Sequence, residues 1–336
     1  MILIIIMVSL LVILFSVYSK DVTSSIKCSM IMCYNSVIPS LFPFFILCEF
    51  LMGTAIGIFK NTAQAAFFSS LLTGFPSGIK NVCILYQNGN IDKRTAVSLL
   101  HCTANASPAY ITAFIGGCIM QSKSAGYILL LSQTVCAFAC AIFFGCFKKK
   151  QKLNNKTGVI SITEVACNSI SNSVCSCLFV CGYIIFFGII ADIMIKLKIP
   201  ETVANILFFL PKETVKSLSI GVIEITRAIN MLDNKTDITC ISIMLGFSGL
   251  SVIMQCISCA IKVGLKPTPI VTGKLIYTLL MPIISTCFIK LLPPKSSGAV
   301  LHTPIISFIM FILFLGFCII FIYNIFDKST KKIYNK

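Results

Sequence analysis

Six segments of the chain are continuously apolar over about the length that an α-helix needs to cross a lipid bilayer. Such a crossing takes about 20 mostly apolar residues. The six segments are Ile2–Tyr18, Ile38–Ile58, Gly126–Phe147, Val174–Ile195, Ile270–Leu292 and Ile305–Phe326. Membrane-spanning β-strands alternate between apolar and polar residues, so these continuous segments exclude a β-barrel. The sequence therefore predicts an all-α polytopic membrane protein.

The composition supports this prediction. Of the 336 residues, 57% are hydrophobic and 11% are charged, whereas an ordinary soluble domain has about 25% charged residues. Two lysine clusters, at residues 148–156 and 328–336, contribute to the net charge of +16. Because both clusters flank apolar segments, we interpret them as cytoplasmic topology signals and not as a nucleic-acid site. The expected partner is the lipid bilayer, and no nucleic acid.

The sequence contains no pattern that indicates an enzyme, a cofactor or a metal. Motifs such as HExxH, the P-loop and GxGxxG are absent, and Gly246–Leu250 is one residue short of GxSxG. Most of the 18 cysteines lie in apolar segments, where cysteine packs as a small hydrophobic residue. The pair Cys256 and Cys259 has no second pair to complete a zinc site. We therefore expect no catalytic residues, no cofactor and no metal site.

Two further segments do not fit as simple spans. Asn61–Gln87 is broken at Gly74–Gly78, and Glu201–Leu232 is broken at Pro211 and again around Ser219–Gly221. The topology closes only if each segment begins and ends on the same side of the membrane. We therefore predict two re-entrant helical hairpins. Non-helical backbone at membrane depth is tolerated only where protein or a water-filled cavity surrounds it.

The order of these segments indicates an internal repeat. Residues 38–147 and 174–292 each contain a span, a hairpin, a broken span and a second span, in opposite orientations. Inverted repeats with discontinuous helices are typical of secondary transporters, whose site lies near the midplane between the repeats. The basic loops predict that both termini are cytoplasmic. The expected divisions are an N-terminal transmembrane helix at 1–20, a first repeat at 21–147, a basic cytoplasmic linker at 148–163, an inverted second repeat at 164–292, and a C-terminal transmembrane helix with a basic tail at 293–336.

Four features recur in the same order in the two predicted repeats. They are Glu49 and Asp192 in the opening spans, the hairpin breaks at Gly74 and Gly221, Lys80 and Arg227 just after those breaks, and the broken helices at Asn105–Pro108 and Phe247–Ser251. Glu49 and Asp192 are candidates for proton-coupling carboxylates. Both fall near span ends, so a solvated place at the membrane interface is the alternative.

The helix breaks supply the candidate substrate-binding residues. A break leaves helix-end amides free to bind an anion. A charge in hydrocarbon costs about 2.5–3.5 kcal/mol, so Lys80 and Arg227 are expected to face a cavity or a partner. The alternatives are an ordinary turn at the first break, a snorkelling Lys80, an Arg227 that is satisfied by Glu224, and polar groups that join helices. The candidates are Gly74, Pro76, Ser77, Gly78, Lys80, Asn105, Ser107, Glu224, Arg227, Ser248, Gly249, Ser251 and Gln255.

Four motifs carry a resemblance to a known family. They are GFPSGIK at 74–80, NASP at 105–108, IGVIEITRAINML at 220–232 and GFSGLSVIMQ at 246–255. Over roughly residues 25–292 the chain resembles the sporulation integral membrane proteins of the YlbJ type, in the nucleoside-recognition or "Gate" domain group. The resemblance implies passage of dipicolinic acid across the outer forespore membrane and a distant likeness to concentrative nucleoside transporters. Arg227 departs from the family pattern, in which a small residue is usual.

The sequence and the resemblance together predict a transporter of a small anionic solute, by resemblance dipicolinate, that works by alternating access. A transporter of nucleosides or another neutral solute is one alternative, and it would depend on Asn105, Ser107 and Ser248 more than on Lys80. A membrane scaffold of the spore that transports nothing is another, but it would leave the polar helix breaks without a role.

Overall fold

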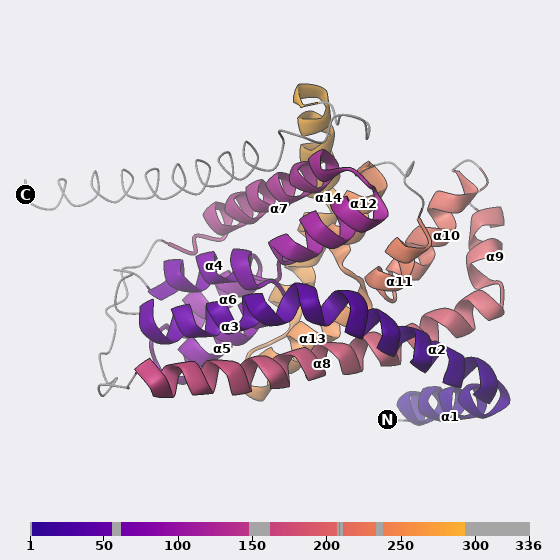
Figure 1. Ribbon diagram of the computed structural model, residues 1–336, viewed down its shortest axis with the longest axis horizontal. Coiled ribbons are helices and arrows are strands. Elements are labelled where there is room, and N and C mark those ends of the chain that lie inside the picture. The colour runs from indigo at the N-terminus through magenta and orange to yellow at the C-terminus, as the bar shows by residue number, and fades with distance from the viewer. Residues whose placement is uncertain are drawn as a thin grey trace, which may run out of the picture. The chain divides into compact units, whose positions relative to one another are not determined.

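The computed structural model describes residues 2–55, 62–147, 162–206, 208, 211–232 and 238–292 (Figure 1). Met1–Pro293 form one compact unit, and the second unit, Pro294–Lys336, lies outside the described residues. The predicted span Ile305–Phe326 and residues 148–161 of the predicted linker therefore also lie outside them. The helices are α1 (Ile2–Val17), α2 (Ser19–Met32), η1 (Cys33–Val37), α3 (Ile38–Ala55), α4 (Thr62–Thr73), α5 (Ser77–Gln87), α6 (Lys93–Leu100), η2 (Tyr110–Ile119), α7 (Lys123–Phe143), α8 (Ile162–Lys196), α9 (Ile199–Ile206), α10 (Lys212–Gly221), α11 (Ile225–Asn230), α12 (Ile238–Phe247), α13 (Gly249–Lys262) and α14 (Thr268–Leu291).

All regular elements among the described residues are helices, which confirms the predicted all-α class. Five of these helical stretches are long and apolar enough to cross a membrane: Ser19–Phe50, Lys123–Phe143, Ile162–Lys196, Ile238–Lys262 and Thr268–Leu291. Val8–Val17, within α1, and Tyr110–Ile119 are shorter apolar helices. The chain is therefore a multi-pass membrane protein.

The predicted start of the second span, at Ile38, is wrong. One helical stretch runs from Ser19 through the π-helical turn η1 into α3. Its first half is polar in sequence, which reads as a loop, but the small polar side chains of Ser25 and Ser29 are buried against the rest of the fold. Tertiary packing therefore extends the helix beyond its apolar part.

The fourth predicted span, Val174–Ile195, is also longer in the structure. Helix α8 begins at Ile162 and has 35 residues, so at about 1.5 Å per residue it is about 52 Å long. The hydrocarbon core is about 30 Å thick, so α8 must tilt or extend beyond it. The predicted spans Gly126–Phe147 and Ile270–Leu292 correspond to α7 and α14, and their bounds agree with those helices to within a few residues.

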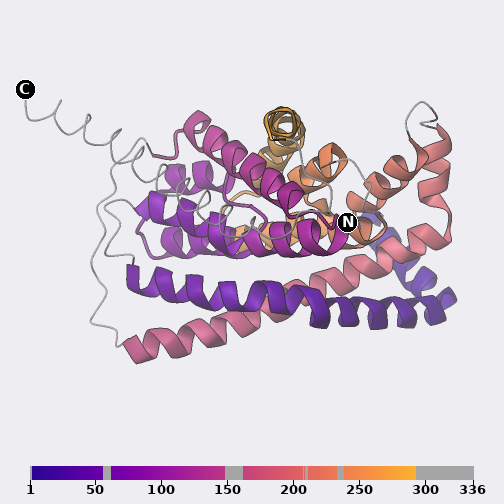
Figure 2. The ribbon, with the colours of Figure 1, turned by 45° about the horizontal axis from the view of Figure 1, so that its top comes forward.

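Helix α8 lies alongside the stretch formed by α2, η1 and α3, as both ribbon views show (Figures 1 and 2). The apolar core between them includes Val37, Leu41 and Phe45 from one side and Val180 and Ile184 from the other. These two long helices are the opening spans of the two predicted repeats. They form the framework on which the helix breaks are placed.

The first predicted hairpin is a pair of helices, α4 and α5, separated at Gly74–Pro76, where Gly74 has φ +75°. The second consists of α9, α10 and α11. Its predicted break at Pro211 is confirmed, but the later break lies at Val222–Glu224 and not at Ser219–Gly221. Gly221 completes α10, and the Glu224 side chain then caps α11. The re-entrant and inverted arrangement of these hairpins stays a prediction.

Both predicted breaks in the long helices are confirmed. The chain is irregular at residues 101–107, between α6 and the π-helical segment η2. Helices α12 and α13 are separated at Ser248, which has φ +67° and is followed by Gly249 with φ +77°. The first predicted repeat therefore has one break in its hairpin and one in its long helix, and the second has two in its hairpin and one in its long helix.

Candidate functional site

The two breaks of the first predicted repeat are in direct contact. A Cβ atom at Gly74 would lie 2.5 Å from the backbone nitrogen of Ser107, and one at Gly78 would overlap the carbonyl oxygen of Thr103. Both Ser77 and Ser107 are buried beside this contact. Glycine is required here because only its bare backbone permits so close an approach.

In the second predicted repeat, the breaks at Val222–Glu224 and at Ser248 are also in contact, through backbone hydrogen bonds. The amides of Leu250 and Ser251 donate to the carbonyl oxygens of Val222 and Ile223, at 2.8 Å and 3.0 Å. A Cβ atom at Gly249 would lie 2.9 Å from the carbonyl oxygen of Gly221. These two amides at the start of α13 are therefore occupied by protein acceptors.

One side chain from the helix that closes each repeat holds the neighbouring break. Gln133 of α7 forms two hydrogen bonds of 2.9 Å with the backbone of Ala106, one to its amide and one to its carbonyl. Lys274 of α14 donates to the Ser248 hydroxyl at 2.7 Å. Sequence reasoning missed both residues. Lys274 carried a usable signal, since it is a charged residue inside an apolar span.

Lys80 and Arg227 each form an ion pair with the carboxylate that the repeat pattern matches to them. Lys80 Nζ lies 3.1 Å from Glu49 Oε1 and 3.1 Å from Ser176 Oγ. Arg227 Nη2 lies 2.7 Å from Asp192 Oδ2. Glu49 and Asp192 lie on the opening spans, so each ion pair ties a hairpin to the long helix of its own repeat.

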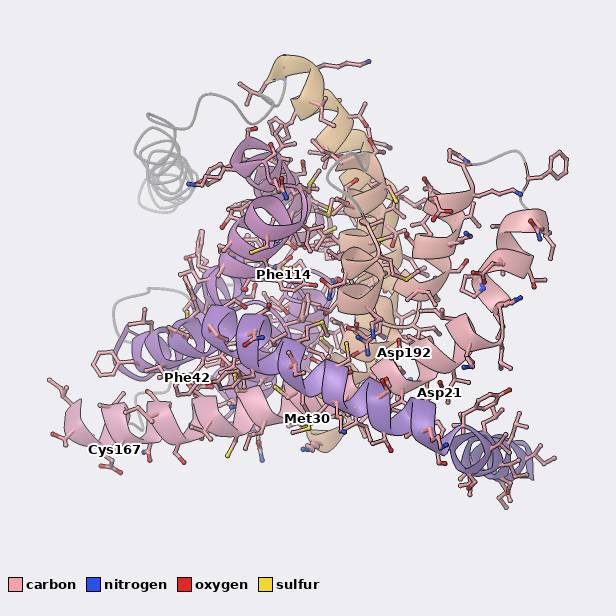
Figure 3. The ribbon with its side chains drawn as sticks, turned by 45° about the vertical axis from the view of Figure 1, so that its right-hand side comes forward. Asp21, Met30, Phe42, Phe114, Cys167 and Asp192 are labelled. Atoms are coloured by element: carbon pink, nitrogen blue, oxygen red, sulfur yellow. The ribbon has the colours of Figure 1, made fainter. Side chains whose placement is uncertain are left out.

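The Arg227 guanidinium lies between α8 and α2. It donates to Ser29 Oγ at 3.2 Å and to Cys28 Sγ at 2.9 Å, in addition to its bond with Asp192. Figure 3 shows Asp192 on α8, near the α2 segment. The Glu224 carboxylate accepts instead from the backbone amide of Arg227, at 2.6 Å. The alternative in which Glu224 satisfies the Arg227 side chain is therefore wrong.

A small pocket, partly open to the surroundings, lies where the breaks of the two predicted repeats meet. It is lined by Val37, Leu41, Phe75, Ser107, Tyr110, Val180, Ile184, Glu224, Ile225, Thr226, Val252 and Gln255. Three predicted site residues are among these: Ser107, Glu224 and Gln255. The Gln255 side chain donates to Ser251 Oγ at 3.4 Å, but its buried Oε1 atom has no hydrogen-bond partner.

The remaining predicted residues surround the breaks but do not line the pocket. Asn105 accepts a hydrogen bond of 3.1 Å from the Tyr277 hydroxyl, and its amide donates to Ser70 Oγ at 3.3 Å. The buried hydroxyl of Ser77 has no hydrogen-bond partner. Pro76 directly precedes α5. The structure thus gathers the predicted residues around one region and places Lys80 in an ion pair outside the pocket lining.

Lys274 is a buried cation without a carboxylate partner among the described residues. Its side chain is 3% exposed, and it takes part in none of the ion pairs that the described part of the chain forms. Its ammonium lies 5.6 Å from the centre of the Phe75 ring and 5.6 Å from that of Tyr277. Since Phe75 lines the pocket, the positive charge of Lys274 lies close to the pocket.

No cluster of three or more histidine, cysteine, aspartate or glutamate residues that could hold a metal ion occurs within the described ranges. The polar groups around the pocket are hydroxyls, an amide, a carboxyl and the nearby ammonium of Lys274. These groups can bind a small polar solute by hydrogen bonds and by charge.

No family model matches the chain, and no solved structure matches it. The chain is 24% identical over 278 residues to the sporulation integral membrane protein YlbJ of Bacillus subtilis (strain 168). The alignment covers 68% of this chain and 68% of that relative. The similarity confirms the resemblance that was drawn from the four motifs.

Proposed function

We propose that this chain is a membrane transporter of a small anionic solute, which the resemblance suggests to be dipicolinate. The observation that carries the proposal is that helix breaks from both repeats line one pocket. Phe75 and Ser107 come from the first repeat, and Glu224 and Thr226 come from the second. Transporters built from inverted repeats place their solute at such a meeting point, where unwound backbone faces a cavity.

The distribution of contacts supports movement of one repeat against the other. Within each predicted repeat, a hairpin break and the long-helix break are packed backbone to backbone. Between the predicted repeats, Tyr110 donates to Thr226 at 3.4 Å and Tyr277 donates to Asn105 at 3.1 Å, and these bonds join neutral groups. The bonds of Lys80 to Ser176 and of Arg227 to Ser29 and Cys28 also join the two repeats, and each involves one charged group. Neutral hydrogen bonds contribute only about 0.5–1.5 kcal/mol each, so they can be exchanged during alternating access.

The charges near the pocket support an anionic solute through Lys274. Lys80 and Arg227 already have carboxylate partners, whereas Lys274 has none among the described residues. Lys274 is not itself a lining residue, but its ammonium lies 5.6 Å from the centre of the Phe75 ring, which lines the pocket. A solute carboxylate in the pocket would be attracted by this buried charge, because charges in the interior are screened less than at the surface.

A neutral solute such as a nucleoside is the second candidate. It is favoured by the uncharged groups of the lining, above all the unpartnered Oε1 atom of Gln255 and the hydroxyls of Ser107 and Tyr110. In that case the charge of Lys274 would serve only to hold Ser248.

The proposal is tested by the dipicolinate content of spores from a strain that lacks this chain. We expect the deletion to deplete dipicolinate and the parent chain to restore it. Lys274→Arg should restore it in part, because arginine keeps the charge but has a different shape. Lys274→Met should fail at matched membrane levels of protein. Full restoration by Lys274→Met would favour the neutral solute or a scaffold, and normal dipicolinate in the deletion strain would contradict the transport of dipicolinate.

A further inference from the structure

Glu224 is a carboxyl group buried at the wall of the pocket. It is 1% exposed and lies in the break between α10 and α11, where it caps α11. It is also the one acidic residue among those that line the pocket. A charge in such a place requires a partner, because burial removes its hydration.

The hydrogen-bond partners of Glu224 are neutral groups. Its carboxylate accepts from the backbone amide of Arg227 at 2.6 Å, and the backbone and hydroxyl of Thr226 stabilise it as well. The Arg227 guanidinium forms its ion pair with Asp192 and not with Glu224. The charge of Arg227 nevertheless acts on Glu224 through space, although the two side chains form no ion pair. The other titratable groups that interact electrostatically with Glu224 are Tyr110 on η2 and Cys33 on η1, and neither is cationic.

The two carboxylates that the sequence suggested for proton coupling differ from Glu224, because each of them forms an ion pair. Glu49 is paired with Lys80 at 3.1 Å, and Asp192 is paired with Arg227 at 2.7 Å. Neither lines the pocket. A carboxylate in a close ion pair favours its charged form, so it is a poor proton carrier.

We propose that Glu224 binds the coupling proton of solute transport, an inference that rests on the proposed function. On the acidic side of the membrane the carboxylate takes up one proton and becomes a neutral acid. The acid has an O–H group to donate, and Gln255 Oε1 is an unpartnered acceptor in the same lining. The proton leaves with the solute on the opposite side and restores the carboxylate.

The test uses the full chain, purified and reconstituted into lipid vesicles, with labelled dipicolinate. Two rates are measured: exchange of solute at equal pH on both sides, and accumulation driven by an inward proton gradient. We expect the gradient to drive accumulation by the parent chain. We expect Glu224→Gln, which mimics the protonated acid, to exchange solute at a measurable rate and to lose the gradient-driven part entirely. The control is Glu213→Gln, since Glu213 is an exposed carboxylate on α10 that pairs with Lys216.

The outcomes separate this inference from the proposed function. Absence of exchange by the parent chain would count against the proposed function itself. Exchange that no proton gradient accelerates, or that a sodium gradient drives instead, would overturn the assignment of a proton. Gradient-driven accumulation that survives in Glu224→Gln, or loss of exchange together with accumulation in that variant, would overturn the role of Glu224.

Discussion

The two predicted repeats contain matching ion pairs, Lys80 with Glu49 in the first and Arg227 with Asp192 in the second. In each case a cation that follows a helix break meets a carboxylate on the opening span. Lys80 and Glu49 have side chains that are 29% and 13% exposed, so both are largely out of water. Removing one partner would leave the other charge poorly solvated.

The Lys80 pair should therefore show strong coupling in a double-mutant cycle. We expect Lys80→Met and Glu49→Gln each to lower the thermal stability of the purified protein, and the double variant to lose less than the sum of the two. Breaking a fully buried pair costs about 3–5 kcal/mol; because this pair is partly exposed, we expect about 1–3 kcal/mol of coupling. The exposed pair of Lys216 and Glu213 is the control and should show little coupling. Additive losses at Lys80 and Glu49 would contradict a stabilising pair.

At the residue scale, sequence reasoning found the members of these pairs but not their partners. The sequence shows a basic residue after a break in each predicted repeat, Lys80 and Arg227, and an acidic residue before it, Glu49 and Asp192. Their contacts depend on how α3 and α8 pack, which no local pattern encodes. Lys274 could have been noticed as a charged residue inside an apolar span, but its partner, the hydroxyl of Ser248, becomes apparent only once α14 is placed beside α12.

At the scale of elements, the glycines of the breaks determine how closely the helices approach. In α5, a methyl group at Gly78 would overlap the Thr103 carbonyl and lie 2.6 Å from Ser70 Cβ. In α8, a methyl group at Gly182 would meet nothing within 4 Å. The same substitution therefore has opposite consequences in two helices of one protein.

We expect Gly78→Ala to destabilise the purified protein and to lower solute transport, whereas Gly182→Ala should leave both unchanged or raise stability slightly. Overpacking in a tight contact costs about 1–3 kcal/mol, while alanine in an open helix position gains up to about 1 kcal/mol over glycine. Thermal unfolding in detergent, with transport by equal amounts of protein, measures both effects. Equal behaviour of the two variants would mean that the contact between the breaks at residues 74–78 and 103–107 is loose.

The breaks themselves were predictable because glycine and proline interrupt otherwise apolar segments. Gly74–Pro76, Pro211 and Ser248 all interrupt helices as the sequence indicates. The polar first half of the stretch from Ser19 was not predictable as helix, because burial of its serines depends on α8 and Arg227. Likewise the later break of the second hairpin lies at Val222–Glu224, where Glu224 caps the start of α11, and the glycine pattern does not reveal this cap.

At the scale of the whole molecule, the similarity to a sporulation membrane protein agrees with a multi-pass helical chain. The inverted repeat and the cytoplasmic termini stay predictions. The matching ion pairs and the contact between breaks within each repeat are what two related halves would produce. The pocket lies where those halves meet, which is where a transporter needs its solute site.

The central claim is that solute passes through the pocket between the breaks, and pocket-filling variants test it most directly. Val180 lines the pocket from α8 and is 2% exposed, whereas Leu178 on the same helix is 64% exposed. In vesicles that contain the purified chain, we predict exchange of labelled dipicolinate by the parent and by Leu178→Phe, and none by Val180→Phe at equal reconstitution. Exchange by Val180→Phe at the parental rate would contradict a path through this pocket.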